Sequence, residues 1–138
     1  MSGEKVAREV AEKEFERFAK AWDIDVNVEG MANADRDSFN AQKDRIVSKI
    51  MSGAATVGDK GEISYDLQHP GEGVQTLVFQ VPNGAAYMAM DRHKDRESMH
   101  KLYEFLGAMT KQPPKFFANM DARDVKFCQG VAVLFLAS

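Results

Sequence analysis

The sequence predicts a single α+β domain, in which helices at both ends of the chain enclose a small antiparallel sheet. Residues 1–53 and 82–138 carry apolar side chains at helical spacing, whereas residues 54–81 alternate apolar and polar side chains as strands do. The 138 residues suit one domain, and the 44% that are hydrophobic are an ordinary share for a globular protein. We therefore expect N-terminal helices, a β-hairpin extended to a three-stranded sheet, and a C-terminal helical bundle.

The N-terminal part, residues 1–53, is expected to hold two helices. In residues 4–22 the apolar side chains recur every three to five positions, and charges of both signs fill the other face. Residues 23–30 then alternate polar and apolar side chains, which indicates a short strand or an extended linker. A second helix should begin at residue 33 or 35 and end before Gly53, which occupies the position of a left-handed cap.

The middle part, residues 54–81, has the pattern of a β-meander. Residues 55–57 and 63–67 are predicted to form a hairpin, because glycines bound the turn between them. The proline and glycines of residues 69–73 indicate a loop, and residues 74–81 are predicted to form the third strand.

The C-terminal part, residues 82–138, is expected to be helical. A short helix is predicted over residues 85–91 and a longer one over residues 96–111, followed by a turn that starts at Pro113-Pro114. Asp121 is a predicted N-cap of the last helix, and Asp124 should interact favourably with the dipole of that helix. Apolar residues nearly surround this helix, so it should be the most buried element or contact another subunit.

Charge and composition exclude several classes of protein. The net charge of −3 argues against a general nucleic-acid binder. The longest apolar run, residues 131–137, is far shorter than the ~20 residues of a membrane span. The N-terminus has no apolar signal core, and the single cysteine, Cys128, suits a reducing compartment. We therefore expect a cytoplasmic protein that binds neither nucleic acid nor membrane.

The start of a calcium-binding loop is present, but the rest of the loop is missing. Asp23, Asp25 and Asn27 have the spacing of the first ligands of an EF-hand. Such a loop requires glycine at its sixth position and glutamate at its twelfth, where this chain has Val28 and Ala34. The sequence therefore does not predict a calcium site here.

Residues that could support catalysis do not form a known constellation. His93 and His100 lie two helical turns apart and, with Asp91, are the only basis for a metal-dependent hydrolase. The basic residues around them alternate with acids, as on a solvated helix face. Cys128 lies in an apolar helix, where inert packing is expected. We expect no catalytic residue, no metal and no cofactor.

Aromatic and methionine side chains are the candidate binding residues. The chain has eight methionines, whose flexible side chains suit surfaces with variable partners. Adjacent Phe116 and Phe117 cannot easily face the same core, so at least one of them should be partly exposed. The apolar face of helix 4–22 could pack on its own domain, on a neighbour or on a client. Core packing is the alternative for each of the candidates, which are Phe15, Phe18, Trp22, Phe116, Phe117 and Met120.

Short motifs in the C-terminal half follow one another in a distinctive order. They are Thr76–Val81, Pro82–Ala86, Met88–Arg92, Lys101–Thr110, Pro113-Pro114 and Met120–Val125. This order resembles the tail assembly chaperones of long-tailed phages, including those of Mu-like prophages. In that family a strand and a turn precede a helix, a Pro-Pro corner and a helix that starts with Leu-Asp-Ala-Arg-Asp. Helix 4–22 lies outside the part of the chain that resembles the family.

The resemblance implies a non-enzymatic chaperone of the bacterial host's cytoplasm that binds the tape measure protein during tail assembly. It also implies a homo-oligomer, with the tail tube protein as a further partner. A helical client exposes apolar stripes before assembly, and adaptable side chains could bind them. One alternative is a structural tail or head–tail accessory protein that stays in the particle. The other is the small metal-dependent hydrolase built on His93, His100 and Asp91.

Overall fold

The computed structural model describes residues 6–71, 73–91 and 98–136 of the chain. Within them, helices precede and follow a three-stranded antiparallel sheet, so the predicted α+β class is confirmed. The elements in chain order are α1 (Arg8–Ala21), η1 (Val28–Gly30), α2 (Asn33–Ser52), β1 (Ala55–Val57), β2 (Ile63–Asp66), β3 (Thr76–Phe79), α3 (Ala85–Asp91), α4 (Ser98–Thr110), α5 (Pro114–Ala118) and α6 (Ala122–Leu136).

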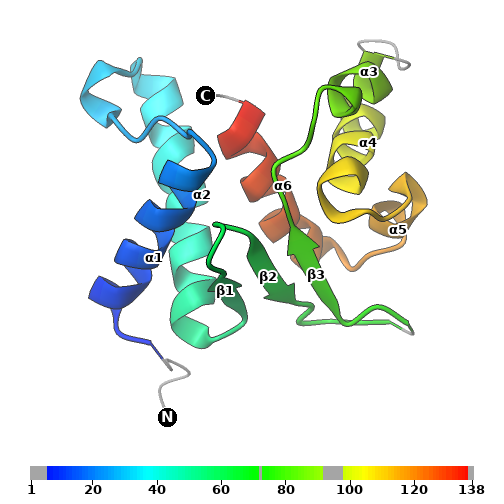
Figure 1. Ribbon diagram of the computed structural model, residues 1–138, viewed down its shortest axis with the longest axis horizontal. Coiled ribbons are helices and arrows are strands. Elements are labelled where there is room, and N and C mark those ends of the chain that lie inside the picture. The colour runs from blue at the N-terminus through cyan, green and yellow to red at the C-terminus, as the bar shows by residue number, and fades with distance from the viewer. Residues whose placement is uncertain (1–5, 72, 92–97, 137–138) are drawn as a thin grey trace.

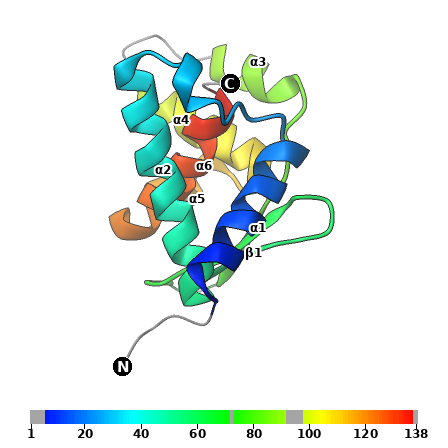
Figure 2. The ribbon, with the colours of Figure 1, turned by 90° about the vertical axis from the view of Figure 1, so that its left-hand side faces the viewer.

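Helix α6 lies between two groups of helices (Figure 1). The pair α1 and α2 lies on one side of it, and α3, α4 and α5 lie on the other. Viewed from the side of α1 and α2, α6 runs behind this pair (Figure 2), and it contacts both α2 and α4. Its central place agrees with its nearly continuous apolar surface. Neither α6 nor another helix in the described residues is both long and apolar enough to cross a membrane.

Helix α1 packs its apolar stripe against its own domain. Phe15 and Phe18 are fully buried, and Trp22, one residue beyond the helix, is 3% exposed. Ring centroids lie 5.0 Å apart between Phe18 and Trp22, and 5.7 Å apart between Trp22 and Phe135 of α6. Aromatic pairs at these distances add to the free energy of area burial. The row of rings therefore fastens the first helix to the last.

The first helix and the third strand differ from their predicted bounds. The helix expected over residues 4–22 begins at Arg8, and Ala7 before it is extended. Gly53 ends α2 with a left-handed φ of +85°, as predicted. Of the two alternatives for residues 23–30, a short strand or an extended linker, the linker is present and contains η1. The third strand is shorter than the predicted range 74–81, because the Gln80 N–H donates to the Met109 carbonyl of α4 (3.0 Å) and so leaves the sheet.

The sheet has the order β1-β2-β3, and a side chain of α1 covers one end of its outer strand β1. Ile63 of β2 lies opposite Val57 of β1 and Phe79 of β3. The guanidinium of Arg17 in α1 donates to the carbonyl oxygens of Val57 and Gly58, both at 2.8 Å. These bonds occupy carbonyls at the end of β1, which hinders pairing of this end of the strand with another chain.

The predicted corner and cap near the C-terminus are also present. Pro114 occupies the first turn of α5, where a missing N–H costs nothing. Asp121 precedes α6, and its Oδ1 accepts a hydrogen bond from the N–H of Arg123 (2.9 Å). The start predicted for the preceding helix, at residue 96, lies outside the described residues, and α4 is described from Ser98.

We predict that Gly61→Ala destabilises the protein much more than Gly73→Ala. Both glycines have positive φ, +84° and +95°, which costs an L-residue about 1–2 kcal/mol. A Cβ on Gly61 would also lie 2.3 Å from the Cβ of Ala21, whereas one on Gly73 would meet nothing within 4 Å. The crowding should raise the loss for Gly61→Ala to about 3 kcal/mol. Urea unfolding of the two variants measures the difference, and equal losses would contradict the close approach of the turn to α1.

Candidate protein-binding site

A buried carboxylate at the start of α6 organises the region where the candidate binding residues lie. Asp124 is in the first turn of α6 and is 1% exposed. Its Oδ1 accepts hydrogen bonds from the Tyr65 hydroxyl (2.7 Å) and the Gln68 N–H (2.9 Å). Its Oδ2 accepts the N–H of His69 (2.9 Å). The carboxylate thereby joins the last helix to β2 and to the loop that follows β2.

These contacts offset the free-energy cost of burying the Asp124 carboxylate and fix the positions of the residues around it. Burying a carboxylate is costly unless donors surround it, and here three donors and the first turn of a helix do so. The ring of Phe127 stacks on the ring of Tyr65, with centroids 4.0 Å apart, and helps to hold Tyr65 in place. Burial and then the hydrogen bond to Asp124 raise the pKa of Tyr65 well above its ordinary value. Tyr65 therefore stays a neutral donor.

Cys128, one turn further along α6, is part of the same apolar surroundings. It is fully buried, and burial followed by the nearby charge of Asp124 raises the pKa of its thiol well above the ordinary value. A thiol held protonated is a poor nucleophile. The expected role of Cys128 in packing agrees with this environment.

An open groove lies beside the carboxylate, between the loop after β2 and the end of α5. Its volume is about 500 Å³. Side chains that are partly buried against the core supply its apolar surface, and loop and cap residues form its rim. We call it the Met120 groove, and it is lined by Leu67, His69, Pro70, Gly71, Val74, Phe116, Asn119, Met120 and Asp121.

The two walls of the Met120 groove differ in rigidity. Phe116 packs edge-on against buried Phe117, with centroids 5.4 Å apart, so its ring has a fixed base. Met120 lies with its sulfur 3.9 Å from the sulfur of Cys128, and its side chain has three rotatable bonds. On the opposite wall, the backbone of the loop is held by Asp124. The groove thus combines a fixed frame with one adaptable side chain.

The rim of the groove carries a local ion pair. The guanidinium of Arg123 donates to both carboxylate oxygens of Asp121, each at 2.9 Å. This pairing holds the pKa of Asp121 below its usual range, so the cap stays charged. The opposite charges largely cancel one another at the rim. Apolar contact, rather than net charge, is therefore what the Met120 groove offers to a partner.

A smaller hollow lies where the aromatic row reaches the surface near α3. Its volume is about 270 Å³, and Trp22, Val81, Tyr87 and Phe135 line it together with Ala21 and Asp23. The Trp22 Nε1–H donates to the Gly61 carbonyl (2.9 Å), which fixes the indole. Val81 and Tyr87 are about half exposed, at 50% and 47%. This hollow is a second surface with apolar lining, and its volume is about half that of the groove.

The structure separates the six candidate binding residues into two kinds. Phe116 and Met120 are partly exposed and line the Met120 groove. The expectation that at least one of the adjacent phenylalanines is partly exposed is confirmed, because Phe117 is buried and Phe116 is not. The fully or almost fully buried candidates are Phe15, Phe18, Trp22 and Phe117. A domain of this size needs these large rings for its core. Of the four, Trp22 also lines the hollow near α3, although only 3% of its surface is exposed.

Sequence reasoning missed the part that Asp124 and Tyr65 play. Asp124 was assigned only a favourable place near the helix dipole, and Tyr65 only a place in a strand. The signal was an acid on the inward face of a very apolar helix, which requires a buried donor. Finding that donor requires knowing which strand α6 crosses.

The residues of the hydrolase alternative are only partly described. His93 lies outside the described residues, and the side chain of Asp91 is also not described. His100 is exposed on α4. Among the described residues, no group of three or more His, Cys, Asp or Glu side chains is placed to hold a metal ion.

Neither a protein-family model, nor a curated protein, nor a solved structure matches this chain. The chemistry of its own surface must therefore indicate what it binds.

We predict that Asp124→Ala lowers the free energy of unfolding by at least about 3 kcal/mol. The substitution leaves the Tyr65 hydroxyl and two backbone N–H groups without their acceptor. Tyr65→Phe is the matched variant, since it removes one of these bonds and keeps the ring on Phe127, and it should cost about 1.5 kcal/mol. Urea unfolding measures both, and a smaller loss for Asp124→Ala than for Tyr65→Phe would refute this account.

We also predict a loss of stability at alkaline pH that depends on Tyr65. Because its pKa is raised in the folded protein, its contribution is complete below the unfolded value of about 10. Above that pH the unfolded chain releases the proton and the folded chain retains it, so the free energy of unfolding should fall by about 1.4 kcal/mol per pH unit. Denaturant titrations of wild type and Tyr65→Phe on either side of pH ~10 test this. The free energy of unfolding of Tyr65→Phe should fall less steeply with pH than that of the wild type, and identical slopes would contradict the prediction.

Proposed function

We propose that the protein is a non-enzymatic phage or prophage tail assembly chaperone, which binds the tape measure protein during tail morphogenesis in the bacterial host. The observation that carries the proposal is the Met120 groove, an open and mainly apolar groove at the two candidate residues that are partly exposed. The motifs that resemble the chaperone family, from residue 74 onward, include α5 and the start of α6 beside this groove.

The chemistry of the groove suits the apolar stripe of a helical client. Such a stripe presents side chains at i, i+3 and i+4, which an apolar groove can accept in turn. Phe116 offers a ring with a fixed base, and aromatic anchors commonly supply most of the energy of an interface. Met120 can change rotamer as the shape of the client changes along its length. These properties favour weak binding to many related segments over tight binding to one.

Weak binding at each site is sufficient when many copies act along one long chain. Copies bound side by side raise each other's effective concentration, and avidity then exceeds the affinity of a single site. The homo-oligomer implied by the resemblance belongs to the same proposal, and contact with the tail tube protein is a further part of it. Covering apolar stripes in this way would keep an unassembled client from aggregating.

Two experiments test this function. Co-expression of this chain with the tape measure protein of the same phage or prophage should keep that protein soluble and yield a complex on purification. Mass spectrometry of finished particles should then find the tape measure protein without this chain. Detection of this chain in the particles at a fixed stoichiometry would instead support a structural tail or head–tail accessory protein. Failure to form a complex would overturn the chaperone proposal.

We predict that Met120→Gln weakens binding of tape measure segments by about tenfold, which corresponds to about 1.4 kcal/mol. The change keeps the length of the side chain and places an amide on the apolar wall of the groove. Met88→Gln is the matched control, because Met88 is 71% exposed on α3 and does not line the groove. Fluorescence anisotropy with labelled client peptides measures both affinities, and equal effects of the two variants would exclude the groove as the binding surface.

Phe117→Ala serves as the structural reference for that series. The ring of Phe117 is fully buried, so its loss should lower the free energy of unfolding by about 3–5 kcal/mol. Met120→Gln should cost far less stability because Met120 is partly exposed. If Met120→Gln unfolded the protein as much as Phe117→Ala, its effect on binding would be indirect.

A further inference from the structure

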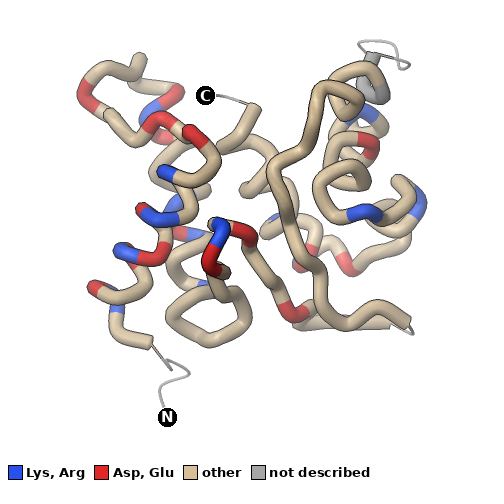
Figure 3. The backbone as a smooth tube through the Cα atoms, viewed as in Figure 1, with Lys and Arg blue, Asp and Glu red and all other residues tan. Residues whose placement is uncertain are grey.

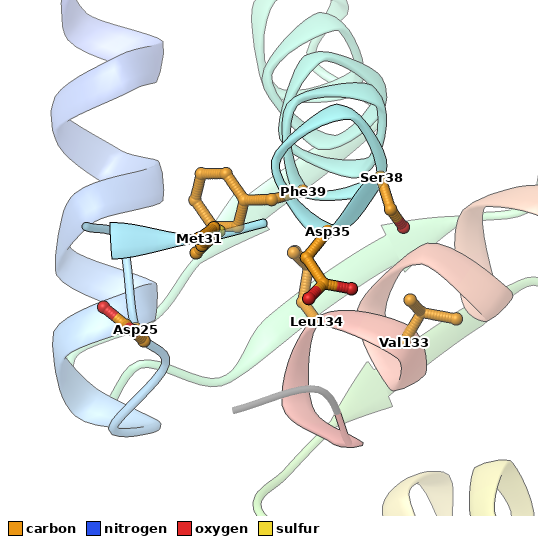
Figure 4. A pocket seen from close by; sticks show the side chains of 7 residues that line it. All are labelled: Asp25, Met31, Asp35, Ser38, Phe39, Val133 and Leu134. Atoms are coloured by element: carbon orange, nitrogen blue, oxygen red, sulfur yellow. The ribbon is translucent and has the colours of Figure 1, made fainter. Parts of the chain in front are cut away.

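A second pocket lies at the other end of α6, where its last turns meet η1 and the start of α2 (Figure 4). Its volume is about 290 Å³. Phe39 and Leu134 are almost fully buried at its base, and Met31 lies against Phe39. The residues that line it are Asp25, Met31, Asp35, Ser38, Phe39, Val133 and Leu134. We call it the acidic pocket, for its two aspartates; it shares no lining residue with the Met120 groove.

The segment that forms the mouth of the acidic pocket carries a strong excess of negative charge. Residues 23–37 contain five carboxylates, at Asp23, Asp25, Glu29, Asp35 and Asp37, and a single base, Arg36. The guanidinium of Arg36 donates to the Asn33 side chain (2.7 Å). Figure 3 shows acidic segments gathered at this corner of the molecule. All five carboxylate residues are exposed, so their charges face solvent and any approaching partner.

Backbone dipoles do not remove this negative potential. The last turns of α6 bring the negative end of a helix to the pocket through Val133 and Leu134. The positive end of α2 lies at the same mouth, but its first turns carry Asp35 and Asp37. Since a helix end is equivalent to only about half an elementary charge, the carboxylates outweigh it.

The combination of an apolar base and an acidic mouth determines which class of partner can bind in the pocket. The base is made of Met31, Phe39, Val133 and Leu134, which would receive an apolar side chain. In Figure 4 the carboxylate of Asp35 lies beside Leu134, while that of Asp25 points away from the other labelled side chains and its Oδ1 accepts the Asn27 N–H (2.9 Å). A lysine or arginine of the same partner could therefore pair with Asp35. A calcium ion requires six to eight oxygen ligands, whereas most of this wall is carbon. An acidic peptide or a nucleic acid would be repelled.

We propose that the acidic pocket docks a basic amphipathic helix of a protein partner. One apolar side chain of that helix enters the pocket, and a basic residue three or four positions away pairs with Asp35. The interaction is separate from client binding in the Met120 groove and requires a different partner chemistry, which combines apolar contact with positive charge. This proposed interaction does not depend on whether the client in the Met120 groove is a tape measure protein.

The test uses the full chain and two synthetic helical peptides that share one leucine stripe. One peptide carries lysines beside the stripe, and the other carries glutamates at the same positions. In fluorescence anisotropy the lysine peptide should bind at least about tenfold more tightly, and added salt should weaken its binding because exposed charges are screened. Equal binding of the two peptides, or binding of the lysine peptide that salt does not change, would overturn the proposal.

Two variants separate the charge from the volume of the acidic pocket. Asp35→Lys reverses a charge at the mouth, and Ser38→Phe fills the pocket while leaving every carboxylate in place. Each should weaken binding of the lysine peptide by about fivefold or more, from the loss of an ion pair or of the buried leucine. Asp44→Lys is the control for net charge, because Asp44 lies on the same helix and does not line the pocket. Since Asp44 pairs with Arg8 of α1 (3.6 Å), urea unfolding must also show that this variant keeps its fold.

Asp35 and Ser38 are exposed, so circular dichroism and urea unfolding should show intact folds for both variants. If Asp44→Lys weakens binding as much as Asp35→Lys, the peptide senses only net charge and the pocket is not the site. Calcium titration of the unliganded protein supplies a further check. A calorimetric response that Asp35→Lys abolishes would mark an ion site and overturn the peptide proposal.

Discussion

The buried carboxylate of Asp124 is the constraint on which the rest of this structure depends. A charge in the interior must be surrounded by donors, and here β2 and the following loop supply them to α6. That requirement selects the register at which α6 crosses the sheet and stacks Phe127 on Tyr65. The same carboxylate holds the loop after β2 in place. One wall of the Met120 groove is therefore positioned by a side chain that is itself buried.

Helix α6 is the common axis of the molecule, and its two ends present different surfaces. The N-terminal end adjoins the Met120 groove, which is apolar and whose rim charges, Asp121 and Arg123, neutralise each other. The C-terminal end adjoins the acidic pocket, where carboxylates surround an apolar base. Two partners of different chemistry could therefore occupy one copy of the protein at the same time. Because α6 is packed along its length between helices, both surfaces rest on a rigid support.

The aromatic residues show how a small domain distributes its large side chains. The rings of Phe15, Phe18, Trp22 and Phe135 form a continuous row from α1 to α6, which joins the two ends of the chain. Rings that could serve as binding anchors are instead buried in the core, since a domain of this length has few other large apolar side chains with which to fill it. What remains for partners are the residues at the margins of the core, such as Phe116 and Met120, which are partly buried against the core and partly exposed.

The sequence by itself determined the local structure, because each signal acts within a few residues. Helical periodicity predicted α2 to its glycine cap, Gly53, and alternation predicted the hairpin of β1 and β2. Asp121 could likewise be identified as a helix cap, since its partner lies two positions away. Only the tertiary structure decided which apolar faces are buried in the core and which remain exposed. It alone placed Asp124 against Tyr65, and Asp25 in the lining of a pocket with Leu134 at its base. The physical reason is that burial and pairing over such separations depend on how the helices cross, and periodicity along the chain contains no information about that crossing.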